Sequence, residues 1–436
     1  MSSAAQSAAV QPRVGAGLSL VFLWNACGTV LLVLFPPTAP ALLPLCAIVP
    51  LVWYWSVHGR LPWSKPSPVM VAMALVGAYL LLNASWSLSP YAAFRTVGLF
   101  WAITGILYVS LNVLERIDRA VLRAMAMGLI AGMAVGGAVL CVETFTGQGI
   151  RRMLMAFLPA LQPEARHTVV LEDGTAVFRA YLLNRSIAEF TLLFWPVAMA
   201  IERLGLSKWK MACMLAALAP GTAAIVRSEH ATSKIAFAGA LILYVLFRLY
   251  PVVAKRLVVA SWVATIVLVV PLVSLAFSQQ LYRAGWLAPS AQHRVVIWGY
   301  TSEQIGKSLL LGSGIATARA VNEMERSVAK PAPGTTFHLS TSLHSHNAYL
   351  QTWYETGAVG ALLLLSLGLF ILRSIAHSEA RAQAYLYSTF ASSALLAATS
   401  FSICAPWLMS SFAIVTIAAA VGSTHAVPAT AVRPTS

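Results

Sequence analysis

Two histidines, His344 and His346, stand in a polar segment of the chain and are followed directly by Asn347. Imidazole is the side chain that most often takes a proton from a hydroxyl group near neutral pH. A helix capped by Ser345 would place His346 at its positive end, where the pKa of an imidazole is lowered. Because a neutral imidazole is the form that accepts a proton, this pattern predicts that His346 acts as a general base.

Basic side chains could hold an anionic group such as a diphosphate or a phosphorylated lipid beside this histidine. Six candidates lie at span ends or in the flanking loops on one side of the expected membrane spans: Arg95, Arg179, Arg185, Arg227, Lys234 and Arg294. Each one taken alone could instead anchor a span in the membrane interface, and we expect that role for about half of them. We rank Arg294 first as a substrate-binding residue, followed by Arg185 and Lys234.

Acidic residues that could hold a metal ion are scarce. The chain has two aspartates, Asp118 and Asp173, which are far apart in the sequence. The Asp-x-Asp metal site that many sugar transferases use is therefore absent. Arg and Lys would then neutralise the charge that Mg²⁺ neutralises elsewhere, so we expect a reaction without a metal ion or other cofactor.

The elements that position these residues are expected to be membrane helices. Of the 436 residues, 59% are hydrophobic and 10% are charged, whereas an average soluble domain has about 25% charged residues. The chain lacks the polar surface that a water-soluble fold needs, which predicts an all-α integral membrane protein. We expect membrane lipids rather than nucleic acid as its surroundings.

Breaks at proline, glycine and charge clusters divide the apolar runs into about twelve expected transmembrane spans. Their approximate limits are 14–35, 41–57, 67–83, 95–114, 120–144, 186–201, 211–226, 234–248, 257–277, 358–372, 383–403 and 407–422. Together they form one membrane domain, 1–436.

The charge of the loops predicts how these spans are oriented. Loops on one side hold 15 of the 29 basic residues, and the short loops on the other side hold three. The positive-inside rule therefore predicts cytoplasmic termini. Two long loops, 146–185 and 278–357, are expected on the outer face, and the second one carries the histidine motif.

The first long loop has two parts with distinct patterns. Residues 151–158 are basic and apolar, which suits a segment lying in the membrane interface. In residues 168–178 an Asp-Gly pair lies between β-forming residues, and this pattern predicts a tight hairpin. Such a hairpin would return Arg179 and Arg185 to the membrane surface.

The end of the second long loop resembles the signature of the O-antigen ligase family, in which His and then Asn, Ser or Gln precede nine residues and Gly-x-x-Gly. His346 and Asn347, with Gly357 and Gly360, fit this spacing, whereas counting from His344 does not. The motif therefore selects His346 as the base. If one helix ran from His346 through Gly357, the two would share a face, and the glycine would let a neighbouring helix or lipid chain approach.

Two further segments are similar to parts of the same family. Residues 292–298 and 311–314 resemble its Arg-containing amphipathic helix and the Gly-rich turn that follows. Residues 231–234 resemble a Ser or Thr followed by Arg, although Lys234 stands where the family usually has Arg. A point charge at Lys234 weakens the case for a bidentate phosphate clamp there.

The resemblance implies a function and a fold. It implies a GT-C-type glycosyltransferase of the bacterial inner membrane with its active site on the periplasmic side. Such an enzyme transfers a polysaccharide from undecaprenyl diphosphate to a sugar hydroxyl of lipid A-core, which completes lipopolysaccharide. The resemblance also supports His346 as the base and basic side chains as the diphosphate clamp, with Asn347 as a further substrate-binding residue.

Other functions remain open at this point. O-antigen polymerases and protein O-oligosaccharyltransferases, which move the same kind of glycan onto Ser or Thr, are close alternatives, and nothing in the sequence identifies the acceptor. A transporter of lipid-linked glycans is a more distant alternative. Transporters usually place ionisable residues or broken helices near the bilayer midplane, whereas Glu143 and Glu189 are expected near the outer ends of their spans.

Overall fold

The chain is described by a computed structural model that covers residues 3–157, 167–170, 176–325, 329–399 and 401–424. Within these residues it consists of helices and one two-stranded sheet. The elements are α1 (Ser3–Leu34), α2 (Ala39–His58), α3 (Pro68–Asn83), α4 (Pro90–Leu114), α5 (Arg119–Phe145), α6 (Gly149–Phe157), β1 (Thr168–Val170), β2 (Ala176–Phe178), α7 (Asn184–Arg203), α8 (Lys208–Ala216), α9 (Ala219–Arg227), α10 (Ala231–Leu249), α11 (Pro251–Ser278), α12 (Pro289–Ile305), α13 (Thr317–Glu325), α14 (Ala348–Ala376), α15 (Ala380–Thr399) and α16 (Pro406–Thr424).

Ten helical segments of the described chain are long and apolar enough to cross a membrane. They correspond to ten of the twelve expected spans. The expected span 211–226 is interrupted, since α8 ends at Ala216 and α9 begins at Ala219. The prediction of an all-α integral membrane fold is confirmed.

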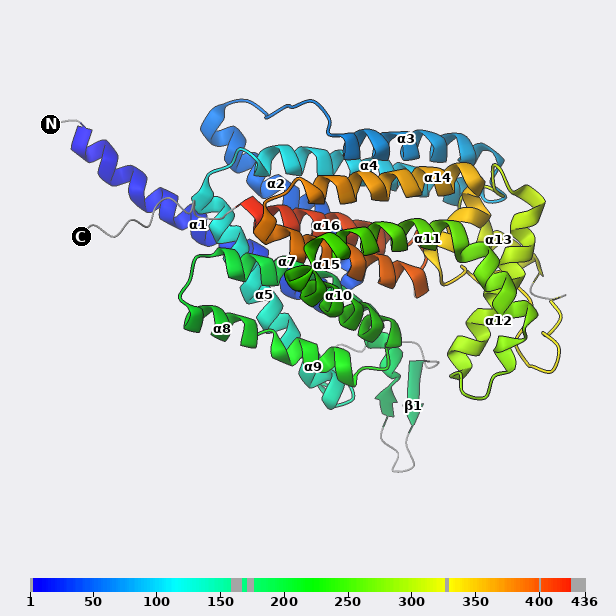
Figure 1. Cartoon of the computed structure of the whole chain (residues 1–436). Helices are drawn as coiled ribbons and strands as arrows, with labels where there is room; N and C mark the ends of the chain where they lie inside the picture. The colour runs from blue at the N-terminus through cyan, green and yellow to red at the C-terminus, as the bar shows by residue number, and fades with distance from the viewer. Residues whose placement is uncertain (1–2, 158–166, 171–175, 326–328, 400, 425–436) are drawn as a thin grey trace.

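The other two expected spans, 186–201 and 383–403, correspond to α7 and α15, which have 20 residues each but are less apolar than the ten. Both helices lie inside the bundle, where α7 packs against α5, α15 and α16 (Figure 1). A helix surrounded by protein can carry polar groups that find partners on its neighbours. Glu189 of α7, for example, is fully buried and accepts a hydrogen bond from the hydroxyl of Ser411 at 2.6 Å.

The local sequence explains where several helices begin and how closely they pack. Proline, which lacks a backbone N–H and has a helical φ, occupies the first position of α3, α4, α11, α12 and α16.

In α5, Gly128 and Gly132 are one turn apart and face α1. A Cβ on Gly132 would lie 2.6 Å from the carbonyl oxygen of Ala26, so these small residues let the two helices touch.

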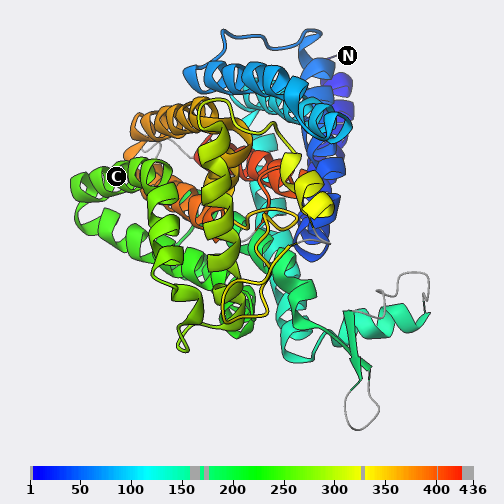
Figure 2. The same cartoon turned by 90° about the vertical axis from the view of Figure 1, so that its right-hand side faces the viewer.

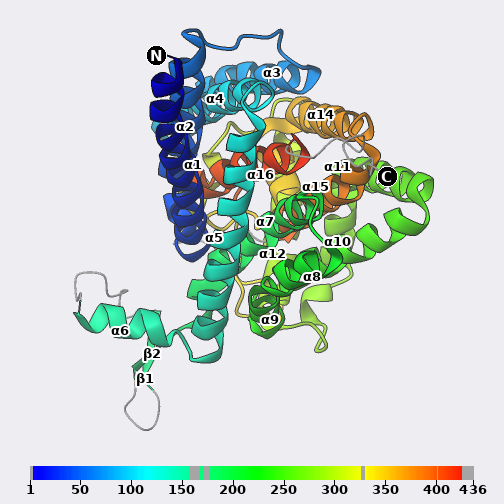
Figure 3. The same cartoon turned by 90° about the vertical axis from the view of Figure 1, so that its left-hand side faces the viewer.

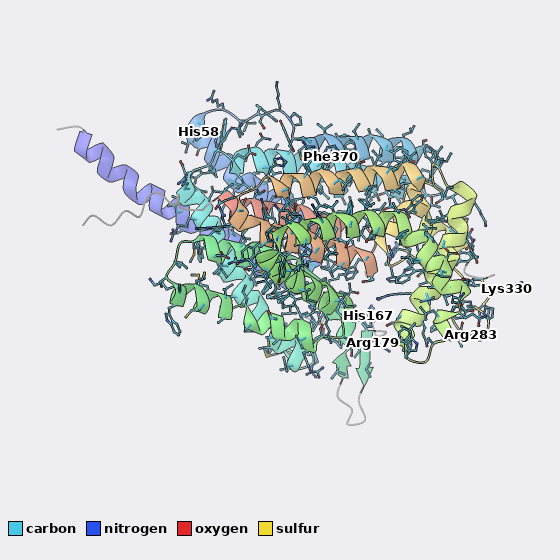
Figure 4. All side chains as sticks on the ribbon, viewed as in Figure 1. His58, His167, Arg179, Arg283, Lys330 and Phe370 are labelled. Carbon is cyan, nitrogen blue, oxygen red and sulfur yellow. The ribbon has the colours of Figure 1, made fainter. Side chains whose placement is uncertain are left out.

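Two helices, α12 and α13, lie across one end of the bundle, next to the ends of α11 and α14 (Figure 1). We refer to this end as the α12 end. The first helix, α1, begins at the opposite end. Figure 4 shows Arg283 and Lys330 at the α12 end and His58 at the opposite end.

Helix α6 and the strands β1 and β2 project from the side of the bundle (Figures 2 and 3). In the view along the bundle, α6 runs in the plane of the picture, across the direction of the long helices (Figure 2). Its side chains Met153, Leu154 and Phe157 are exposed. A short helix with exposed apolar residues and two arginines suits the membrane interface that the pattern of residues 151–158 predicts.

The strands β1 and β2 pair in antiparallel fashion, with Val170 opposite Ala176. The predicted hairpin is thus confirmed as a strand pair. Its Asp173-Gly174 turn lies outside the described residues. Arg179 follows β2 directly at the base of the hairpin (Figure 4).

Membrane orientation can be tested by labelling single cysteines in a variant whose five native cysteines are replaced. With cytoplasmic termini, Ser207→Cys, between α7 and α8, should react with a membrane-impermeant maleimide only after spheroplasts are permeabilised. Lys330→Cys, at the α12 end, should react in intact spheroplasts. Labelling of Ser207→Cys in intact spheroplasts would show that the orientation derived from loop charge is inverted.

Candidate functional site

The two histidines of the motif contact each other in the loop that leads into α14. The ring centroids of His344 and His346 are 4.1 Å apart. The backbone N–H of His346 donates to Nδ1 of His344 at 3.2 Å. The φ of His346 is +53°, a left-handed conformation that is uncommon outside glycine. The loop therefore holds His346 in a particular and strained backbone conformation just before the helix.

The helix cap at this point differs from the expected one. The cap is Asn347, whose amide oxygen accepts hydrogen bonds from the N–H groups of Tyr349 and Leu350 at 3.0 Å each. The assignment of Ser345 as the cap was wrong, because its hydroxyl donates to the carbonyl oxygen of Asn347 at 2.8 Å instead. His346 consequently precedes the cap by one residue, and Asn347 is buried with its oxygen engaged by the helix.

Helix α12 is bound to this loop and carries Arg294. Trp298 donates from its indole nitrogen to the carbonyl oxygen of Ser345 at 2.7 Å. Arg294 lies one turn before Trp298 and therefore on the same face of α12. Burial lowers the pKa of Arg294, although a guanidinium remains charged in proteins. The structure thus brings the highest-ranked basic residue close to the histidine loop.

Burial and neighbouring charges keep His344 neutral. Its pKa is lowered to about 3, first by burial and then by the charges of His346, Arg319 and Arg294. Burial disfavours the charged imidazolium, and nearby cations disfavour it further. His344 is therefore a neutral ring at physiological pH, with cations from α12 and α13 around it.

A third histidine, His230, joins the site from the connection between α9 and α10. Its side chain is buried, and its Nδ1 lies 2.7 Å from Oγ of Ser233. Burial and the charge of Arg294 lower its pKa to about 4.

The sequence analysis missed His230 and Arg319, because neither lies in a motif. The position of His230 just before an apolar run was the one signal that could have identified it.

Arg185 is linked to His230 through two aromatic rings. Its guanidinium lies over the ring of Trp407, 5.9 Å from the centroid. Trp407 meets Phe401 edge to face at 4.8 Å, and Phe401 lies 5.6 Å from the ring of His230. Arg185 is exposed at the first turn of α7, so this second-ranked residue belongs to the same side of the bundle.

The remaining predicted basic residues lie around this group rather than in it. Arg227 and Lys234 are exposed at the end of α9 and the start of α10, on either side of His230. Arg179 is exposed at the base of the projecting hairpin (Figure 4). Arg95 is exposed in α4 and, by helical periodicity, faces away from the side of α4 that packs against Ile315.

The helix that follows the histidines is interrupted. Gly357 has a φ of +64° and a ψ of −165°, so α14 stops and restarts there. The expectation that His346 and Gly357 share one helical face was therefore wrong. A Cβ on Gly357 would lie 2.5 Å from the backbone nitrogen of Gly312. The expected close approach at this glycine does occur, and the partner is the Gly-rich turn after α12.

The backbone groups freed by the interruption bond to that turn. The carbonyl oxygens of Tyr354 and Glu355 accept hydrogen bonds from the N–H groups of Ser313 and Gly314 at 3.0 and 2.9 Å. In the other direction, the N–H groups of residues 358 and 359 donate to carbonyl oxygens of residues 309 and 310. Gly360 lies in the restarted helix, where a Cβ would meet the hydroxyl of Thr356.

Buried side chains reinforce the junction between the turn and α14. Asn83 of α3 donates to the carbonyl oxygens of Leu311 and Glu355, and its own oxygen accepts from the N–H of Ile315 at 2.7 Å. The carboxylate of Glu355 accepts from the N–H of Ala318 at 3.2 Å. Asn83 and Glu355 were not predicted, because their partners lie far away in the sequence.

The arrangement combines neutral imidazoles with cationic side chains at the α12 end. A neutral imidazole can take a proton from a hydroxyl group. Guanidinium groups stabilise negative charge on oxygen, including that of a leaving phosphate. The site therefore has the chemical groups for transfer of a substituent from a phosphorylated donor to a hydroxyl acceptor.

Part of the chain is similar to a known family and to several known proteins. Residues 214–365 match the family described as O-antigen ligase, and this stretch contains His230, Arg294 and both motif histidines.

Three relatives carry names that describe them as candidate polysaccharide ligases. The Rickettsia felis protein is 26% identical over 59% of this chain and 63% of its own length. The Rickettsia conorii protein is 26% identical over 54% of this chain and 56% of its own length, and the Rickettsia typhi protein is 25% identical over 53% and 56%. The chain therefore spans less than two thirds of each of these relatives.

The interruption of α14 should make Gly357 intolerant of a side chain. Gly357→Ala forces a side chain onto a backbone conformation (φ +64°, ψ −165°) that is essentially confined to glycine, which costs about 1 to 3 kcal/mol, and it adds a clash with the turn. We expect a clear drop in the thermal unfolding temperature in detergent. Gly105→Ala, in α4, is the control, because a Cβ there meets nothing within 4 Å. Equal unfolding temperatures for Gly357→Ala and the wild type would contradict this role.

Proposed function

Because this chain carries an O-antigen ligase domain over residues 214–365, we propose that it is a glycosyltransferase that ligates a lipid-linked polysaccharide to a lipid acceptor. In this proposal the donor is a polysaccharide on undecaprenyl diphosphate, and the acceptor is a sugar hydroxyl of lipid A-core. The reaction takes place at the periplasmic face of the bacterial inner membrane, in a GT-C-type fold. The observation that carries the proposal is that α12, which carries Arg294, is hydrogen-bonded to the loop of the His344–His346 pair at the α12 end.

The proposed reaction is a displacement at the anomeric carbon of the donor. His346 takes the proton of the acceptor hydroxyl, and the acceptor oxygen forms a bond to that carbon as the bond to the diphosphate oxygen breaks. The diphosphate leaves with the bonding electron pair. Arg294 stabilises its charge, with Arg185 and Lys234 as further contacts, and no metal ion takes part.

Removing the proposed base should abolish transfer. Loss of a general base typically lowers a rate by a factor of about 10² to 10⁴, so His346→Ala should show no visible ligation in proteoliposomes that contain the lipid-linked donor and lipid A-core. His58→Ala is the matched control, because His58 lies at the opposite end of the bundle (Figure 4). Full activity of His346→Ala, with normal membrane insertion, would rule out the proposed mechanism.

The planar guanidinium of Arg294 should matter as well as its charge. We expect Arg294→Ala to reduce transfer strongly and Arg294→Lys to restore it in part, because an ammonium group cannot make two parallel hydrogen bonds to a phosphate. Initial rates at varied donor concentration are the measurement. Arg373→Ala, in the last turn of α14, is the control. An Arg294→Ala protein with wild-type rates would make Arg294 an interfacial anchor.

A further inference from the structure

We propose that His344 is a positioning residue that fixes the orientation of His346 through its Nδ1 atom. This inference rests on the proposed function and gives a role to the histidine that the motif leaves out. The observations are the hydrogen bond from the N–H of His346 to Nδ1 of His344 and the contact between the two rings, with centroids 4.1 Å apart.

The bond joins a side chain to the backbone two residues further on. Asn and Asp make the same contact in Asx turns, where a side-chain oxygen accepts from the backbone and replaces a carbonyl group. In this loop the contact closes over Ser345 and ends on the backbone N–H of His346. The φ of His346 is +53°, which is uncommon for residues other than glycine. A left-handed residue persists when its surroundings hold it, and Nδ1 of His344 is one of the groups that do so.

The role requires one protonation state of His344. An Nδ1 atom that accepts from an N–H carries no proton, so the proton of the neutral ring is on Nε2. The groups that act on this ring are His346 in the same loop, Arg294 of α12 and Arg319 of α13. All three disfavour a second proton, and burial does so as well. The acceptor state of Nδ1 is therefore maintained throughout the physiological pH range.

The opposite nitrogen offers a competing role that can be tested separately. Nε2 of His344 carries an N–H group that could instead donate to the donor's diphosphate. The amide oxygen of an Asn side chain coincides with the position of Nδ1, and the end of a Gln side chain approaches that of Nε2. Asn and Gln at this position therefore separate the two roles of the ring.

The experiment compares His344→Asn, His344→Gln and His344→Ala in the proteoliposome ligation assay. A misplacement of about 1 Å in a catalytic group can lower a rate about 100-fold. We expect His344→Ala and His344→Gln to lose about 10- to 100-fold in kcat with little change in the KM of the acceptor. His344→Asn should stay within about threefold of wild type and keep its pH–rate profile, because the amide accepts the same hydrogen bond without titrating.

Two results would overturn the inference. Recovery by Gln and not by Asn would assign the function to Nε2, and similar rates in all three variants, whether high or low, would remove the role of Nδ1. A second measurement does not depend on ligation: modification of His346 by diethyl pyrocarbonate, followed by mass spectrometry, should be faster in the Ala and Gln variants and unchanged in Asn. If the wild type transfers no glycan, the proposed function fails while this modification pattern still decides the role of His344.

Discussion

The interruption of α14 at Gly357 is the constraint on which the candidate site depends. A helix that stops and restarts leaves backbone groups without partners, and such groups are costly inside a membrane protein. Here the turn after α12 bonds to the carbonyls of Tyr354 and Glu355 and to the N–H groups of Ala358 and Val359. Because both segments need these bonds, neither can move without the other.

This junction also determines where α12 lies, since only a short 3-10 helix, Gly306–Ser308, separates the turn from α12. A second bond, from Trp298 to the carbonyl oxygen of Ser345, fixes α12 to the histidine loop. With two points of attachment, the helix has little freedom. Arg294, whose charge lowers the pKa of His344, is therefore positioned by contacts that other residues make. In the proposed enzyme, the glycine of the motif therefore holds the site together, and the histidine performs the chemistry.

Sequence patterns predicted the parts of this arrangement that depend on composition and local spacing. Long apolar runs identified the spans, and motif spacing singled out Gly357 as a point of close approach. The helix cap was assigned to Ser345 because serine is a good cap. Asn347 is an equally good cap, and the structure places it in that role. The left-handed φ of His346 is not helical, so the helix begins after this residue. The effect of Arg294 on His230 could not be predicted, because it depends on how separate helices pack.

The charges near the histidines would act differently before and after a donor binds in the proposed reaction. Without a donor, Arg294 contributes to keeping both His230 and His344 uncharged. A bound diphosphate would offset the positive charge of Arg294, and this change favours proton uptake by the neighbouring imidazoles. The imidazole that acts as the base would then become more basic once the donor is in place. The same cations could thus bind the leaving group and link proton transfer to its presence.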